Sequence, residues 1–533
     1  MPLERNSRAC VISFGIMNPG LGCEVTWRSC ISTSGRSRPS ANWCGEAGQT
    51  KSRVARVKKD IFDFVFKLCE YANCFKLREQ TRFENSDLHR RWIEPLNSNY
   101  PEMVPLQGLA SVHRRYSHGL ATMLFASLAS FGARGADYSL TGFGTIGYAV
   151  SDQKSPYLRY VDKGGSLKAD SLIGLQGEAQ FNPQWGATLQ VVASAPRFKD
   201  EGLAAQARWA FLSYRPDNDW LLRIGKMRVP FLLNTQNSEV GMTFSQARLP
   251  VEMYSTFPVY DANGAAFTKT WLLDGSEVNL DGYGGHADFK FRNPFHADPA
   301  LRLFPDAYVP ESANIKGMIL TRTSGSLSLR AGIHRAVVTT PGTQKVVDGF
   351  FPNTFPAPPP FGGALYAPGK VIPHFGLNLL TFGVEWKPSD WRFSAEYAKR
   401  TVKETILGVS SQSFSGTVER DFGRWTPYAT YARLLSAPET RQLYRDLNAT
   451  PVPLGAQGPP LFVPSTFHRI LGGQVFVYDQ YSVMLGTAYS LSRESKLKFE
   501  WMRTHVGLAS VLVDGDFRNK SFNVFSLSYN FAF

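Results

Sequence analysis

Alternation between large apolar and small polar side chains is the feature of this sequence that most restricts its fold. Over residues 525–533 every odd position carries Phe, Leu or Tyr, and every even position carries Ser, Asn or Ala. Alternate side chains of a β-strand point to opposite sides of a sheet, so the segment predicts a strand with one apolar and one polar face. Strand ends in water tend to fray, whereas this apolar face continues to the ring of Phe533. The pattern favours a strand that stays in nonpolar surroundings along its length.

The same alternation begins at Asp137 and continues through the rest of the sequence. It is plain over residues 327–334, 391–398 and 497–502. We assign the apolar sets to lipid and the polar sets to a lumen, because strands of membrane barrels are apolar outside and polar inside. Residues 136–533 therefore predict an all-β protein, a transmembrane antiparallel β-barrel of about 16 strands, with the first strand at 138–150.

Short and long connections alternate between the predicted strands. This inequality is typical of membrane barrels, which have short periplasmic turns and long extracellular loops. Closure is expected to bring the strand at Tyr138 beside the strand at Phe533, because an open edge would leave backbone groups unpaired in hydrocarbon. Residues 474–491 form one strand or two, and an even strand count requires one. Short turns are expected at 182–184, 216–219, 274–275, 323–325, 387–390, 421–424 and 492–494, and long segments at 230–262, 288–312, 339–374, 437–473 and 507–518.

Composition gives no indication of membrane-spanning helices. Mean hydropathy is −0.20, and the longest apolar run, residues 119–132, is shorter than the roughly 20 residues that a spanning helix needs. Barrel strands escape such a test because half of each strand is polar.

The first part of the chain differs from the rest. Residues 1–110 are rich in Arg and Ser and hold all six cysteines, which lack metal-ligand spacing, so we predict no metal and no other cofactor. We interpret 1–110 as an upstream extension that is absent from the mature protein; a separate cysteine-bearing domain is the alternative. Residues 111–135 have the basic start, apolar core and small residues of a signal peptide, with cleavage before Ala136. The absence of cysteine after residue 74 suits export to an oxidising compartment.

Several segments resemble the 16-stranded general porins of Gram-negative bacteria, particularly those of β-proteobacteria. The resemblance rests on residues 139–144 (SLTGFG), 223–230 (RIGKMRVP), 423–428 (GRWTPY) and on Phe533. It implies a homotrimer of water-filled barrels in the cell outer membrane, in contact with lipid and lipopolysaccharide. In such porins the loop after the fifth strand folds inward, which places a constriction at about 230–262 here. The Pro-Glu-Phe-Gly-Gly motif of enterobacterial porins is absent, so its geometry is not transferred. The resemblance also makes Tyr529, Phe531 and Phe533 a signal read by the barrel assembly machinery.

Charge in the predicted lumen is mixed, with an excess of basic residues. Residues 137–533 contain 39 Lys and Arg against 33 Asp and Glu. A ring of arginines favours anions, so we predict a weak anion preference. The alternative is that these arginines are structural and pair with Glu178, Glu396 or Glu500. Alternation places Arg208, Arg223, Arg330, Arg392, Arg400, Arg433 and Lys498 in the lumen, and the constriction loop carries Glu239, Glu252 and Asp261.

The function that these patterns favour is passive diffusion of small hydrophilic solutes and ions through an outer-membrane channel. A substrate-specific channel for a sugar or an organic anion is the nearest alternative, with Tyr254, Phe257 and Tyr260 as an aromatic path. An adhesin or a phospholipase-type barrel enzyme is a further alternative. The sequence has no nucleophile elbow, so we predict that the protein is not an enzyme. Dispersed basic residues give no indication of nucleic-acid binding.

Overall fold

The computed structural model describes residues 137–196, 202–258, 260–293, 307–341, 346–355, 363–449 and 464–533. All of them belong to the compact unit Ala133–Phe533. The predicted extension at 1–110 and the predicted signal peptide at 111–135 lie outside the described residues. No helix in the described ranges has the length and apolar character that crossing a membrane requires.

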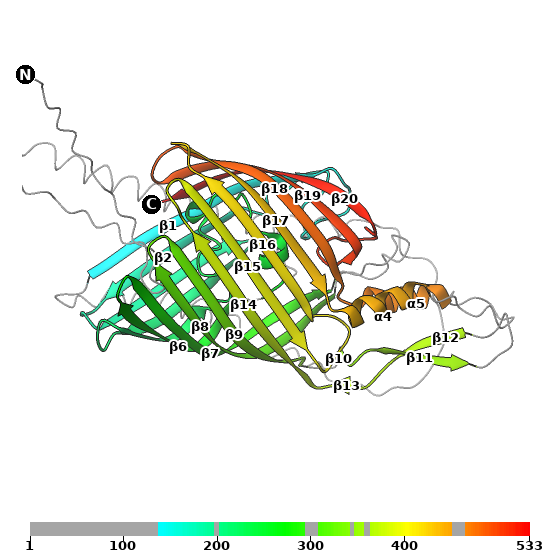
Figure 1. Ribbon diagram of the computed structural model, residues 1–533. Coiled ribbons are helices and arrows are strands. Elements are labelled where there is room, and N and C mark those ends of the chain that lie inside the picture. The colour runs from blue at the N-terminus through cyan, green and yellow to red at the C-terminus, as the bar shows by residue number, and fades with distance from the viewer. Residues whose placement is uncertain are drawn as a thin grey trace, which may run out of the picture. The chain divides into compact units, whose positions relative to one another are not determined.

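Sixteen antiparallel strands form one closed barrel, which confirms the predicted fold class (Figure 1). Each strand pairs with its neighbours in chain order, and β1 pairs with β20 to close the ring. The strands of the wall are β1 (Asp137–Ser151), β2 (Leu172–Gln180), β3 (Trp185–Ser194), β4 (Ala204–Tyr214), β5 (Trp220–Arg228), β6 (Asp261–Leu273), β7 (Ser276–Asn293), β8 (Ala307–Ser324), β9 (Leu327–Thr339), β14 (His374–Trp386), β15 (Trp391–Val402), β16 (Ser411–Arg420), β17 (Trp425–Ser436), β18 (Tyr478–Ser490), β19 (Ser495–Ser510) and β20 (Lys520–Ala532).

Connections of two to five residues join the strands at one end of the barrel, and connections of eight residues or more join them at the other. We call these the turn end and the loop end. All seven predicted turns lie at the turn end, and residues 474–491 contain the single strand β18, as an even count requires. The predicted long segment 288–312 is too wide, because residues 287–293 keep the alternation and pair with 307–313.

Small elements lie within the long connections. Between β9 and β14 there are two two-stranded sheets, and between β17 and β18 there are two helices beyond the loop end of the wall (Figure 1). The connection from β5 to β6 holds two single turns of helix. These elements are β10 (Val346–Val347) with β13 (Val371–Ile372), β11 (Phe350–Phe355) with β12 (Gly363–Pro368), α4 (Pro438–Ala449), α5 (Pro464–Gly473), η1 (Gly241–Thr243) and α3 (Val251–Tyr254).

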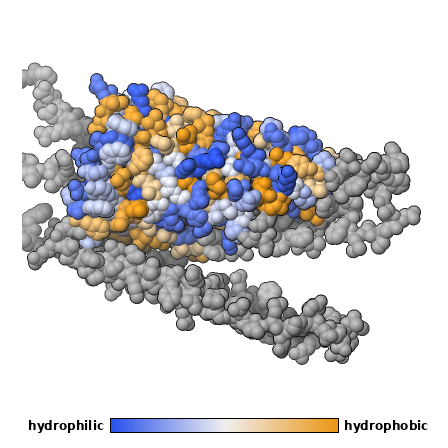
Figure 2. Space-filling model, turned by 90° about the horizontal axis from the view of Figure 1, so that it is seen from below, coloured by the Kyte–Doolittle hydropathy of each residue, from blue (hydrophilic) through white to orange (hydrophobic). Residues whose placement is uncertain are grey.

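The two faces of the wall differ as the alternation predicts. On β9 the side chains of Leu327, Leu329 and Ile333 are exposed on the outside, whereas His334 is buried inside. Figure 2 shows apolar and hydrophilic patches side by side on one face of the wall, and large apolar side chains such as Ile146, Ile224 and Phe525 are exposed on it or elsewhere on the outside. The outer wall therefore carries an apolar band that would be costly to leave in water.

Aromatic rings cover the seam where the barrel closes. Phe533 exchanges backbone hydrogen bonds of 2.8 Å with Gly142. The rings of Phe531 and Phe533 lie over Gly144 and Gly142, where a Cβ would come within 2.5 and 2.3 Å of them. Tyr529, Phe531 and Phe533 form one stack along the outer face of β20, with ring centroids 5.8 and 6.4 Å apart. Glycines on the first strand thus make room for the rings of the last.

Among the glycines described within the wall strands, Gly225 on β5 is the one with a positive φ. Its φ is +133°, and a Cβ there would lie 2.3 Å from the carbonyl oxygen of Ala210 on β4. Only glycine adopts such a conformation without strain.

We expect Gly225→Ala to lower the free energy of unfolding by about 2–4 kcal/mol, because it combines backbone strain with a clash against the neighbouring strand. Gly177→Ala on β2 is the control, since a Cβ there meets nothing within 4 Å. Urea titration, read by heat-modifiable electrophoretic mobility, measures both variants. Equal stability of the two variants would contradict the close approach of β4 and β5.

Candidate functional site

Residues 229–258 and 260, in the connection from β5 to β6, lie inside the barrel. Glu239 pairs with Arg208 on β4, whereas Ser245 donates to Glu419 on β16. These strands stand on opposite sides of the ring, four and twelve positions along its order. A segment that contacts both must cross the interior, and we call residues 229–260 the crossing segment.

Side chains of the wall hold both ends of the crossing segment at β9 and β15. The two oxygens of Glu396 accept hydrogen bonds from the Leu233 amide and the Tyr254 hydroxyl, each at 2.6 Å. Arg330 donates to the carbonyl of Pro230 at 2.6 Å, and Arg400 donates to that of Thr256 at 2.8 Å. The start and the return of the segment thus share one buried carboxylate.

The middle of the crossing segment is held by β16, β17 and β19. Glu419 accepts hydrogen bonds from Ser245 at 2.8 Å and from Gln246 at 2.9 Å. Lys498, which is fully buried, donates to the carbonyl of Gln246 at 2.8 Å and lies 4.1 Å from the ring centroid of Phe244. Lys498 therefore bonds to a backbone carbonyl and makes a cation–π contact with an aromatic ring.

Helix α3 places Glu252 against β18. Its carboxylate accepts hydrogen bonds from Gln480 and Ser482, and its side chain is fully buried. Burial raises the pKa of Glu252. A raised folded-state pKa means that the folded protein binds the proton more tightly, so this contact contributes most at low pH and weakens as pH rises through the folded pKa.

Five charged side chains form a cluster beside β4. Glu239 pairs with Arg208 at 2.9 Å and with Arg228 at 2.6 Å. Asp261, at the start of β6, lies 3.6 Å from Arg208 and 3.1 Å from Lys226. Two of the acids predicted in the loop therefore neutralise a predicted lumen arginine, while Glu252 lies elsewhere, against β18.

Residues 152–171, between β1 and β2, add a second inner layer that the sequence reasoning missed. Tyr157, Leu158 and Val161 are buried and pack in one cluster with wall residues such as Met502 and Phe522. Asp170 pairs with Arg248 of the crossing segment. The signal in the sequence was a pair of apolar residues, 157–158, inside a polar loop.

The remaining predicted basic residues have different positions. Arg223 faces inward on β5 and donates to Thr268 at 3.1 Å, which in turn donates to Asp281 at 2.6 Å. Arg392 pairs with Glu419 at 3.1 Å. Arg433, expected in the lumen, alternates with the buried Ala432 and Leu434 and lies on the outer side of β17, 3.4 Å from Asp479.

Aromatic side chains of the crossing segment pack against one another. Phe257 stacks on Phe231 at 5.1 Å between ring centroids and contacts Tyr260 at 5.8 Å. Tyr254 and Phe257 are each 8% exposed. The three aromatic residues predicted as an alternative solute path thus pack mainly against other side chains of the segment.

No group of three His, Cys, Asp or Glu side chains that could hold a metal ion occurs within the described ranges.

The barrel matches solved structures of Gram-negative outer-membrane porins at low sequence identity. OmpT of Vibrio cholerae is 12% identical, with 76% of this chain and 99% of that chain covered and a TM-score of 0.43. The anion-selective porin from Comamonas acidovorans is 12% identical, with 75% and 100% covered and a TM-score of 0.42. OprB of Pseudomonas putida is 11% identical, with 78% and 97% covered and a TM-score of 0.42. No protein-family model matches the chain, and no curated protein does.

Removal of the Glu396 carboxylate should loosen both ends of the crossing segment. We expect Glu396→Ala to make amide hydrogens of residues 229–260 exchange about 30-fold faster, because it leaves two buried donors without an acceptor. Hydrogen–deuterium exchange with mass spectrometry measures this. Ser394→Ala, on the same strand and face, is the control and should leave the exchange unchanged. Unchanged exchange in Glu396→Ala would contradict the contacts described.

Proposed function

We propose that the protein is an outer-membrane porin, a channel for passive diffusion of small hydrophilic solutes and ions. The observation that carries the proposal is the crossing segment: a closed barrel with an apolar outer band is divided inside by a segment that narrows its lumen. Membrane barrels of this size enclose a polar interior wide enough for water. The crossing segment then acts as the constriction.

A weak anion preference belongs to this proposal. Arg330, Arg400 and Lys498 donate to backbone carbonyls of the crossing segment. A carbonyl carries no net charge, so these hydrogen bonds do not neutralise the positive charges of the three side chains. The acids Glu396 and Glu252 accept from neutral donors in the same way, which keeps the excess small. Positive charge along a narrow path favours anions.

The proposal includes the partners of the barrel in the outer membrane. The apolar outer band would contact outer-membrane lipid and, at the loop end, lipopolysaccharide. Three barrels would associate as a homotrimer. The aromatic stack of Tyr529, Phe531 and Phe533 would serve as the signal for the barrel assembly machinery.

The outer wall carries one arrangement relevant to the enzyme alternative. His505 Nδ1 lies 3.0 Å from the hydroxyl of Ser521 on the outer face. A catalytic base also needs a group that orients its other ring nitrogen. Within the described residues the ring of His505 instead packs against Tyr481, 5.2 Å between centroids, and no carboxylate or amide bonds to its Nε2. The channel remains the function that the geometry supports best.

Planar-bilayer recording of protein purified from membranes of cells that express the whole chain tests the channel. We expect stepwise conductance and a reversal potential of anion-selective sign under a KCl gradient. Absence of conductance from folded, heat-modifiable protein would overturn the porin proposal.

Two arginines on opposite faces of the wall test whether inward charges act on permeating ions. Arg223→Gln removes an inward charge whose hydrogen bond goes to Thr268 of the wall, whereas Arg322→Gln removes an exposed outward charge on β8. We expect the first to lower the anion-to-cation permeability ratio roughly twofold and the second to leave it unchanged. Equal ratios in both variants would contradict an action of inward arginines on permeating ions.

Export by the predicted signal peptide is tested separately. N-terminal sequencing of the protein from outer-membrane fractions should give a mature start close to Ala136. A mature start before residue 120 would refute both the signal peptide at 111–135 and the interpretation of 1–110 as an extension.

A further inference from the structure

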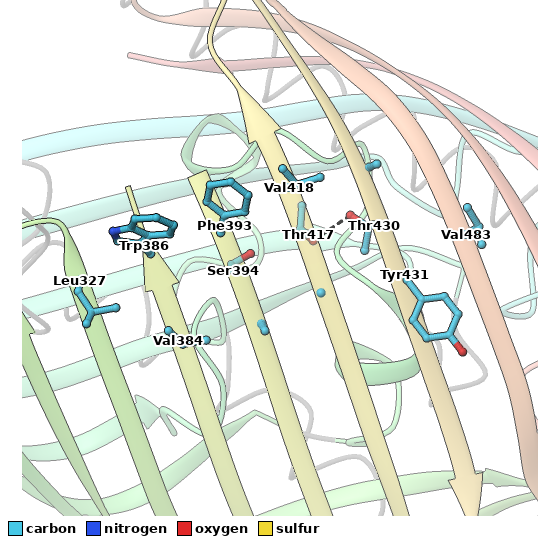
Figure 3. A pocket seen from close by; sticks show the side chains of 13 residues that line it. Leu327, Val384, Trp386, Phe393, Ser394, Thr417, Val418, Thr430, Tyr431 and Val483 are labelled. Carbon is cyan, nitrogen blue, oxygen red and sulfur yellow. Dashed lines mark hydrogen bonds between the residues drawn. The ribbon is translucent and has the colours of Figure 1, made fainter. Parts of the chain in front are cut away.

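An apolar groove of about 770 Å³ crosses the outer wall from β9 to β18, in its turn-end half (Figure 3). Its floor is made of the small residues Ala395 on β15, Gly416 on β16 and Ala429 on β17. Ala395 pairs directly with Gly416, whereas Ala429 pairs with Val418, two positions further along β16. Trp386 and Phe393 stand on one side of the floor and Tyr431 on the other (Figure 3). The hydroxyls of Thr417 and Thr430 bond to each other at 2.8 Å on the inner face, so the groove itself presents almost no polar group.

The groove exists because three small residues interrupt a surface of large ones. Phe393, Tyr431 and Trp386 are each between 38% and 46% exposed, as is typical of the outer band. A Cβ added at Gly416 would meet only the ring of Phe414, at 3.4 Å, so the strand itself has room for a side chain there. The hollow is therefore a feature of residue choice and not a requirement of strand packing.

A cationic group stands at the turn end of this groove. Arg420 follows the lining residue Val418 by two positions on β16, so both lie on the outer face. Its guanidinium lies 4.9 Å from the ring centroid of Trp391 and 4.4 Å from that of Phe422. Within the described ranges it makes no ion pair with an acidic side chain, and its Nε has no hydrogen-bond partner. Lys387 lies in the neighbouring turn between β14 and β15.

We propose that the groove holds an acyl chain of a phospholipid whose phosphate lies at Arg420. The inference rests on the proposed placement of the barrel in a membrane. An apolar hollow that ends at a cation matches a lipid in both parts, because the chain fills the hollow and the phosphate receives charge-assisted hydrogen bonds from the guanidinium. Short turns of such barrels face the periplasm, so the lipid belongs to the periplasmic leaflet. An apolar surface of a second copy of the chain could fill the groove, but the apolar contact alone would supply no anionic group for Arg420.

Native mass spectrometry of the whole protein, taken from detergent into phosphatidylglycerol, tests the proposal by counting retained lipids. We expect Gly416→Leu to lower retention at least about fivefold, because leucine fills the floor. Gly284→Leu on the outer face of β7 is the matched control, since a Cβ there meets only one carbonyl oxygen, at 3.9 Å, and it should retain lipid as the parent does.

The charge is tested with Arg420→Gln and two lipids. We expect this variant to lose about tenfold in retention of phosphatidylglycerol while it retains uncharged diacylglycerol as the parent does. Arg322→Gln, an exposed arginine on the outer face of β8, is the control and should retain both lipids.

Three outcomes would overturn the inference. Equal retention in Gly416→Leu and Gly284→Leu would mean that the groove holds no chain. Equal loss of both lipids in Arg420→Gln would remove the phosphate from the proposal. A lower oligomeric mass in Gly416→Leu, measured by light scattering, would assign the groove to a second copy. Channel recording of the same samples separates this inference from the proposed function, because conductance without lipid retention leaves the porin proposal intact.

Discussion

Pairing of every strand on both sides is the constraint on which the rest of this structure depends. The hydrogen bonds between β1 and β20 remove the two free edges that a sheet of sixteen strands would otherwise expose. Closure also divides space into an outside and an inside, which is why one alternation along each strand suffices to make an apolar belt and an enclosed interior. The glycines opposite the rings of Phe531 and Phe533, and Gly225 opposite β4, are found where strands or rings approach too closely for a side chain.

The crossing segment lies in the interior of the barrel, and its polar groups need hydrogen-bond partners there. The crossing segment has few regular backbone bonds of its own, so its polar groups are paired by wall side chains: Glu396 at both ends, and Glu419 and Lys498 in the middle. Buried charges that bond to neutral groups are costly unless every partner is in place. The segment and the wall therefore depend on each other, and the position of the segment across the barrel is a property of the whole ring.

The alternation in the sequence was sufficient for the closed barrel, for its even strand count and for all seven short turns, because these depend on local residue order. It was insufficient where the interior becomes apolar. On β17 the inward residues Ala432 and Leu434 pack in the interior, whereas Arg433 lies outside with Asp479. A rule that sends polar residues inward fails on such a strand, since the buried layer from residues 152–171 and from α3 makes the inside locally apolar. Contacts between those loops and the wall connect residues more than a hundred positions apart, and no local pattern encodes them.

The same packing limits what the inward arginines can do. Arg330 and Arg400 hold the crossing segment through its carbonyls, so each contributes to the shape of the interior as well as to its charge. Arg208 is neutralised by Glu239 and Asp261. Arg223 differs from these, because in the part of the chain that the structure describes its hydrogen bond goes to Thr268 of the wall and not to the crossing segment. Its charge can therefore be removed while the segment stays in place, whereas removal of Arg330 or Arg400 changes the width and the field of the interior together. Most inward charges of this barrel also hold the crossing segment in place, so a substitution there changes charge and shape together. Charge alone can be changed only at inward residues, such as Arg223, whose hydrogen bonds go to the wall.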